Sequence, residues 1–316
     1  MDMIKIIPVP ICGVALGCAA LGNLLQSYSE TLRMVCGVVS ALFLLLFIIK
    51  VVAFPKLLAE DMTNPIMASV SGTFSMALML LSTYIKGYLG AAGVAFVVWV
   101  VAIALHVALI VFFTVKFVAK IKLQAVFASY YIVYVGIAVA AVTAPVYEAT
   151  AIGAAAFWLG LASFVALFVL VTVRYVKLPN VPEPAKPLIC IYAAPMSLCL
   201  AGYVQSVMPK NHLFLLAMFA VATVIYLFSL VQLVRCLSLP FYPSYAAFTF
   251  PFVISAIASK MTASCLLNMG APLPWLAPVA LVETVIAAIL VIYTCVRYLT
   301  FFEGLTNVTK GRPCVA

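Results

Sequence analysis

The feature that most constrains this chain is a succession of ten apolar runs joined by short connectors. Each run is long enough to cross a bilayer as a helix, which needs about 20 apolar residues. The runs cover residues 10–28, 33–54, 65–85, 91–115, 126–146, 150–173, 187–207, 212–234, 244–267 and 275–299. They lack the strict alternation of barrel strands. The sequence therefore predicts an all-α polytopic membrane protein, with residues 1–316 forming a single integral membrane domain.

Composition excludes a soluble fold. The 316 residues are 67% hydrophobic and only 8% charged, with a mean hydropathy of +1.28, which is far more apolar than a soluble domain requires. A net charge of +9 can indicate a nucleic-acid ligand. Here most of the basic residues lie in short connectors, where membrane topology places them. We therefore expect membrane lipid as the surroundings and no nucleic-acid partner.

The distribution of basic residues predicts the orientation of the chain. Thirteen of the seventeen Lys and Arg residues fall on the side that carries both termini, and three, Arg33, Lys86 and Lys210, fall on the other side. Lys260 is the remaining one, inside the ninth run. Cytoplasmic loops are enriched in Lys and Arg. Both termini are therefore expected in the cytoplasm, with the chain in the cell (inner) membrane.

Odd-numbered and even-numbered runs differ in character. The even-numbered runs are apolar on every face, whereas the odd-numbered ones carry small, hydroxylated and helix-bending residues. Such residues are tolerated in the membrane where neighbours or water satisfy the backbone. We expect the odd-numbered helices to surround a central pore and the even-numbered ones to shield it; the alternative is that small residues only allow close helix packing. Candidate pore-lining or helix-bend residues are Gly17, Ser71, Gly72, Tyr130, Tyr134, Gly136, Pro195 and Pro251.

The candidate bend points recur at a nearly constant spacing. Gly17, Gly72, Gly136, Pro195 and Pro251 are separated by 55, 64, 59 and 56 residues. A period of this length is typical of a repeated supersecondary unit. The sequence thus predicts a helical hairpin used five times.

No group of residues indicates an enzyme, a metal site or a cofactor. The nine cysteines form no C-x-x-C pair, so neither a metal site nor a disulfide framework is expected. His106 and His212 have no carboxylate close to them in sequence. An enzyme acting on lipid would need clustered His, Asp or Glu near the membrane surface, and the sequence shows no such cluster. Neither catalysis nor a bound cofactor is therefore expected.

Two residues of the ninth run are candidates for a pore. Phe250 directly precedes the helix-breaking Pro251, and an aromatic ring at a bend can close a narrow channel by excluding water. The alternative is that Phe250 packs between helices. Lys260 lies about 15 Å further along the helix and, by helical periodicity, about 80° around it. It is a candidate for attracting anions, or it extends to the membrane surface. Since the sequence shows no ring of Arg or Lys, weak selectivity is expected.

Glu283, near the start of the tenth run, is the one acidic residue that lies neither in a connector nor close to the end of a run. A carboxylate within the membrane is a functional candidate, for example as a proton carrier. The alternatives are that it lies near enough to the outer surface to stay hydrated, or that it pairs with Lys260. The residues therefore leave open a pore for anions and a proton-coupled transporter that uses Glu283 or Lys260.

Three stretches carry a resemblance to a known family. They are "PSYAAFTFPFVISA" (243–256), "PVPICGVALGCAALGN" (8–23) and "IYAAPMSLCLAGY" (191–203). They resemble the ninth, first and seventh helices of the tellurite-resistance/dicarboxylate transporter family, which includes the slow-type anion channels of plant guard cells. The resemblance implies five hairpins around a pore, a homotrimer with one pore per subunit, and a blocking phenylalanine at Phe250. It also implies that small inorganic anions, dicarboxylates or tellurite-type oxyanions pass through.

Overall fold

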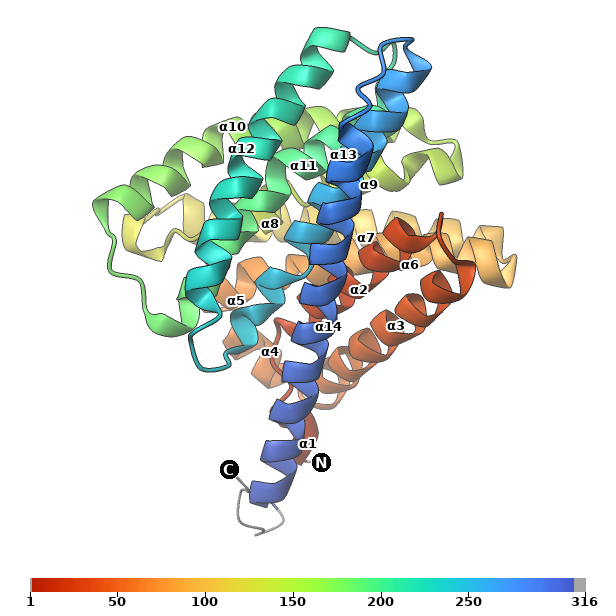
Figure 1. Ribbon diagram of the computed structural model, residues 1–316. Helices are drawn as coiled ribbons and strands as arrows, with labels where there is room; N and C mark the ends of the chain where they lie inside the picture. The colour runs from red at the N-terminus through yellow and green to blue at the C-terminus, as the bar shows by residue number, and fades with distance from the viewer. Residues whose placement is uncertain (1, 310–316) are drawn as a thin grey trace.

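Every regular element of the chain is a helix in the computed structural model, which describes residues 2–309 (Figure 1). The α-helices are α1 (Asp2–Lys5), α2 (Ile11–Leu25), α3 (Glu30–Ala53), α4 (Pro55–Asp61), α5 (Pro65–Val70), α6 (Gly72–Leu89), α7 (Ala92–Phe113), α8 (Tyr130–Tyr134), α9 (Ala138–Thr143), α10 (Thr150–Lys177), α11 (Ala193–Ser206), α12 (His212–Cys236), α13 (Phe250–Asn268) and α14 (Leu276–Thr309). A π-helix, η1 (Thr114–Val118), and the 3-10 helices η2 (Leu123–Ala125), η3 (Ala144–Tyr147), η4 (Glu183–Tyr192) and η5 (Pro243–Phe248) join them.

Eight helical segments of the described chain are long and apolar enough to cross a membrane. They are Glu30–Ala53, Pro65–Leu89, Ala92–Val118, Thr150–Lys177, Glu183–Ser206, His212–Cys236, Pro243–Asn268 and Leu276–Gly304. The first and fifth expected spans are different: α2 has only 15 residues, and residues 126–146 are divided among α8, α9 and η3. The all-helical membrane fold is thus confirmed, whereas ten crossings stay a prediction. In Figure 1, α1 and the C-terminal end of α14 lie at the same end of the bundle.

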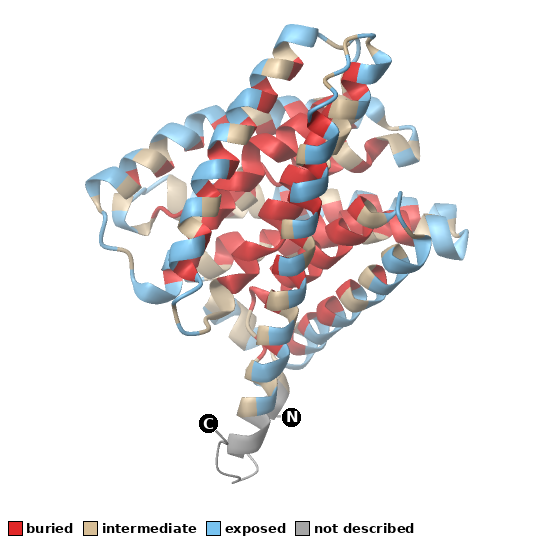
Figure 2. Ribbon diagram, viewed as in Figure 1, coloured by how far each residue is buried: buried red, intermediate tan, exposed pale blue. Residues whose placement is uncertain are grey.

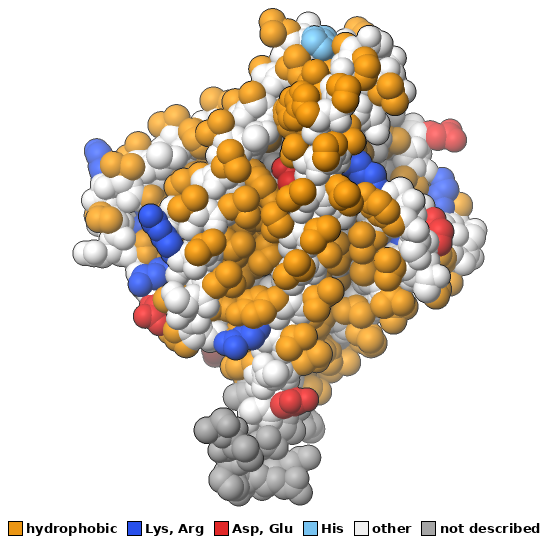
Figure 3. Space-filling model, in the orientation of Figure 1, with side chains coloured by type: hydrophobic (Ala, Val, Ile, Leu, Met, Phe, Trp, Pro, Cys, Tyr) orange, Lys and Arg blue, Asp and Glu red, His pale blue; other side chains and the backbone are white. Residues whose placement is uncertain are grey.

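The segments that correspond to the odd-numbered runs of the sequence form the interior of the molecule (Figure 2). Between 67 and 89% of the most apolar stretch is buried in Pro65–Leu89, Glu183–Ser206 and Pro243–Asn268, and nearly all of α2 is buried. The corresponding share is only 28 to 39% in the five even-numbered segments. Hydrophobic side chains are spread across the whole face seen in Figure 3. A surface of this kind suits lipid rather than water.

Interruptions of the interior helices occur next to most of the expected bend points. Gly72 follows the break between α5 and α6, and Gly136 lies between α8 and α9. Pro195 and Pro251 are in the first turns of α11 and α13, where the helix needs no N–H from them. Gly17 is the exception, because α2 continues through it without a break.

A buried histidine forms a hydrogen bond with the interrupted fifth segment, residues 126–146. The Nε2 atom of His106, on α7, lies 3.0 Å from the carbonyl oxygen of Val133, and Nδ1 lies 2.8 Å from Oγ of Ser75. Because a carbonyl can only accept, Nε2–H donates to Val133 and Nδ1 accepts from Ser75. The partners of His106 are far away in sequence, which is why the sequence showed none. The histidine thus satisfies backbone that the interruption before Gly136 leaves free.

Two glycines allow α2 to approach the start of α13 closely. A Cβ atom added at Gly17 would lie 2.4 Å from Cβ of Thr249 and 3.1 Å from the backbone nitrogen of Phe250. One turn earlier, the carbonyl oxygen of Gly13 accepts a hydrogen bond of 3.0 Å from Oγ1 of Thr249, which also donates to Ala246. Small residues four positions apart commonly form such contacts in membranes. The contact fixes the backbone immediately before Phe250.

Candidate functional site

Two cavities lie end to end within the interior segments. The proximal cavity, on the side of the termini, has a volume of about 310 Å³, and the distal cavity has a volume of about 750 Å³. Residues of the first, third, fifth, seventh and ninth segments line both. The lining of the proximal cavity includes Pro10, Leu16, Val70, Thr73, Tyr131, Ile132, Leu188 and Ser244. The lining of the distal cavity includes Asn23, Thr83, Thr143, Gln205, Ile254, Ser264 and Asn268.

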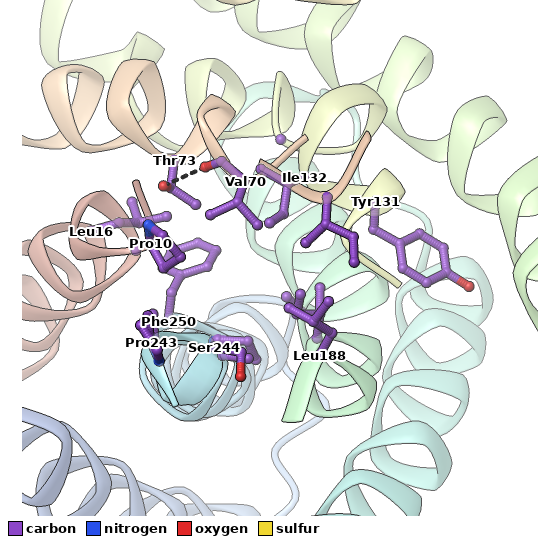
Figure 4. A pocket seen from close by; sticks show the side chains of 18 of the residues that line it. Pro10, Leu16, Val70, Thr73, Tyr131, Ile132, Leu188, Pro243, Ser244 and Phe250 are labelled. Atoms are coloured by element: carbon purple, nitrogen blue, oxygen red, sulfur yellow. Dashed lines mark hydrogen bonds between the residues drawn. The ribbon is translucent and has the colours of Figure 1, made fainter. Parts of the chain in front are cut away.

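Phe250 and Leu198 line both cavities and therefore separate them. Figure 4 shows the ring of Phe250 pointing away from its helix, toward Leu16 and Thr73. The side chain is only 6% exposed. Helical periodicity of about 100° per residue places the α13 residues of the distal cavity, such as Ile254 and Lys260, on the same half of the helix as Phe250. The aromatic residue at the bend thus lies where the two cavities meet.

The proximal cavity is apolar, and all its lining side chains are uncharged. Its lining is rich in proline, a residue without a backbone N–H: Pro8, Pro10, Pro182, Pro184, Pro195, Pro243 and Pro251. Two of its hydroxyl groups already donate to carbonyl oxygens, from Thr73 to Val70 at 2.7 Å and from Ser244 to Pro184 at 2.6 Å. An ion in this cavity would find few groups to replace its water.

The distal cavity, in contrast, is lined by Arg33, Lys210 and Lys260. The guanidinium of Arg33 lies over the rings of Tyr84 and Tyr88, at 4.8 and 5.3 Å, and bonds to Oδ1 of Asn23. A rigid guanidinium suits this kind of stacking. Glu30 offsets part of its charge, at 3.7 Å.

Neutral groups hold the two lysines of the distal cavity. Nζ of Lys260 donates to the carbonyl oxygen of Leu24 at 3.2 Å and to the hydroxyl of Ser27. Nζ of Lys210 donates to the carbonyl oxygens of Tyr203, at 2.8 Å, and Val207. Burial lowers the pKa of Lys210 below the usual lysine range. With no carboxylate among these contacts, both positive charges act on the cavity.

The sequence showed no ring of Arg or Lys, but the structure gathers three basic residues in the lining of the distal cavity. Lys86 also belongs to this end, because it donates to the carbonyl oxygen of Val146, a residue of the distal lining. All three basic residues assigned to the side opposite the termini, and Lys260, are therefore grouped around one cavity. The sequence placed Arg33 and Lys210 next to connectors, but it could not show that those connectors meet.

The other candidate residues divide into two groups. Gly136, Pro195 and Pro251 line the proximal cavity, while Gly17, Ser71, Gly72, Tyr130 and Tyr134 line neither cavity. Tyr134 bonds to Thr114 at 2.8 Å, and Tyr130 packs against Phe113. Tyr131, between them, lines the proximal cavity, and its ring, which points away from the other labelled residues in Figure 4, packs against Tyr192 at 5.4 Å. Sequence alone could not single out Tyr131, because the direction in which a residue of such a short helix points depends on where the helix is interrupted.

Glu283 lies outside both cavities, behind α13. It is 6% exposed, so it is not hydrated at the surface, and its Oε2 atom has no hydrogen-bond partner among the described residues. Lys260 contacts the first segment instead of Glu283. Both structural expectations for Glu283 were therefore wrong.

One family of known proteins matches nearly the whole chain. A family model described as voltage-dependent anion channel matches residues 7–299. The match begins just before the proximal cavity and continues into the tenth segment, so it includes every residue that lines the two cavities. No curated protein matches the chain in a direct sequence comparison.

Proposed function

The chain belongs to the voltage-dependent anion channel family, and we propose that it passes small anions through the two cavities, with Phe250 as the gate between them. Membership of this family makes it a multi-pass membrane protein of a group of channels and transporters, not of enzymes. The observation that supports the gate is the shared position of Phe250 in both cavity walls. An apolar constriction of this kind closes a path by excluding water.

The two cavities have different roles in this proposal. Lys210, Lys260 and Arg33 attract anions into the distal cavity, where the surrounding apolar walls strengthen their field. In the proximal cavity an anion must lose most of its hydration without gaining charged partners. Selection among anions then depends on diameter and dehydration, so small inorganic anions pass and dicarboxylates or tellurite-type oxyanions are further candidates.

The exposed apolar faces of the protein indicate where it is located and what it contacts. We propose the cell (inner) membrane, with both termini cytoplasmic, as the distribution of basic residues predicts. The proximal cavity then opens to the cytoplasm. The exposed side chains of the even-numbered helices can contact lipid or other copies of the chain, and we propose a homotrimer with one path in each subunit.

A proton-coupled dicarboxylate transporter is the second candidate function. It would use Glu283 or Lys260 to carry the proton. Lys260 does line the distal cavity, but Glu283 lies behind α13, outside the path. A coupling carboxyl group should be reachable from the substrate, so the geometry favours the channel.

Planar-bilayer recording tests the proposal. With purified protein and a chloride gradient, we expect currents that reverse at the chloride equilibrium potential, and that follow nitrate when nitrate replaces chloride. The reversal potential should not change when a pH gradient is imposed. A reversal potential that moves with the pH gradient would instead indicate proton coupling, and currents carried by cations would contradict both candidates.

A further inference from the structure

A small polar site lies on the side of α13 that faces away from the two cavities. Its cavity of about 10 Å³ is lined by side chains of α11, α12, α13 and α14, which include Ser197, Thr223, Tyr226, Ser255, Ser259 and Glu283. This volume is close to what one water molecule needs. Hydroxyl groups and a carboxyl group thus surround a space that fits one water molecule or one small ion.

Two polar groups of this site lack partners. Oε2 of Glu283 and the hydroxyl of Tyr226 are buried without a hydrogen bond within residues 2–309. Native proteins rarely leave buried polar atoms unpaired, and a buried carboxylate is costly unless something neutralises it. Tyr226 is the titratable group that faces Glu283 from α12, whereas α11 and α13 present the hydroxyls of Ser197 and Ser259. Among the residues that the structure describes, no cationic side chain lines this site, since Lys260 points toward the distal cavity.

The site is mechanically connected to the gate. Ser259 follows Phe250 by nine positions, which is about 180° around a helix, so the two lie on opposite sides of α13. Between them, Oγ of Ser255 donates to the carbonyl oxygen of Pro251 at 2.9 Å and lies 3.0 Å from Oγ of Ser197 on α11. A change of charge at Glu283 therefore acts on the helix that positions Phe250.

We propose that Glu283, Ser259 and Tyr226 form a binding site for one monovalent cation, a proton or Na⁺, whose occupancy holds α13 in the closed position of the gate. This inference rests on the proposed function of Phe250. When the cation leaves, the buried carboxylate draws water toward itself, and α13 shifts to admit it. Flux through the path therefore rises when the site is empty. The cation acts as a regulator and does not travel with the anion.

Anion flux from liposomes provides the test, with wild type and Glu283→Gln compared from mildly acidic to neutral pH. For wild type we expect flux to rise with pH in a choline medium, choline being too large for the site. Na⁺ added at neutral pH should reverse the rise if Na⁺ binds, and should have no effect if the site takes only a proton. Glu283→Gln should keep the low flux at every pH. Glu148→Gln, a change at an exposed carboxylate, should behave as wild type.

Two further measurements keep the inference separate from the gate itself. Phe250→Ala should show high flux without this pH dependence, because the element that the site controls is gone. Infrared difference spectra should show a protonated carboxyl band at low pH that is absent from Glu283→Gln. The inference is overturned if Glu283→Gln retains the pH dependence of wild type, or if no such band exists. Failure of Phe250→Ala to raise flux would instead refute the gate.

Discussion

Replacing Phe250 with alanine should open the path between the two cavities. In the closed arrangement Phe250 is only 6% exposed, so moving its ring aside exposes nearly the whole side chain. Exposing a phenylalanine costs about 1.5–3 kcal/mol, and twisting it away from its preferred rotamer adds about 0.5–1.5 kcal/mol. The barrier that the ring imposes is therefore about 2–4.5 kcal/mol on these terms.

This barrier converts directly into an expected flux. Since about 1.4 kcal/mol corresponds to a factor of ten, Phe250→Ala should raise chloride flux by about 30-fold or more. Stopped-flow measurement of chloride release from liposomes, at equal protein content, gives the ratio. Phe250→Trp should keep the low flux because a larger ring still separates the cavities.

Phe248→Ala is the matched control. Phe248 is fully buried two positions earlier, packs against Tyr245 at 4.6 Å, and lines neither cavity. Its truncation should lower thermal stability, by about 3–5 kcal/mol for a filled core position, without raising flux. An equal rise in both alanine variants would show that loosened packing, not the loss of a gate, increases leakage. If flux does not rise in Phe250→Ala, Phe250 does not close the path between the two cavities.

Four contacts around the path give further predictions. Gly17→Ala should destabilise the protein by about 1–3 kcal/mol in thermal unfolding in detergent, because the added Cβ meets the backbone next to the gate, whereas Gly93→Ala, with open space around it, should be neutral. His106→Leu should cost about 1–3 kcal/mol in the same assay, since it leaves the buried carbonyl oxygen of Val133 without its partner. Lys260→Gln should reduce anion flux at low ionic strength and have little effect in about 1 M salt, where the Debye length is near 3 Å. Lys210 should add a loss of flux as pH rises, because its charge is present below its pKa and absent above it; burial lowers that pKa, so the loss should begin below the usual lysine range and vanish in Lys210→Gln.

The sequence predicted those features that depend on single residues or on local pattern. Membrane helices follow from run length alone, and the contrast between plain and weakened runs anticipated which segments are buried. Phe250 could be chosen as a candidate because it precedes Pro251, a residue that a helix accepts only near its start, and its role as a gate stays a prediction. These signals are local, so they survive without knowledge of how the helices are arranged.

Features that depend on how helices and connectors are placed relative to one another could not be predicted from the sequence. The grouping of Arg33 and Lys210 requires two connectors, far apart along the chain, to meet at one end. The surroundings of Glu283 depend on the rotation of α14 against α13, and a rotation of half a turn would have placed the carboxyl group in lipid. Similarly, Gly136 signalled a weak point in the fifth segment, but not that the whole segment would divide into pieces of five and six residues.

The contrast between the dry proximal cavity and the charged distal one gives the proposed conduit an electrical polarity. Anions are concentrated at one mouth and not at the other, so equal and opposite voltages should draw unequal currents. We expect the protein to rectify, with the larger current when anions enter from the lysine-bearing side.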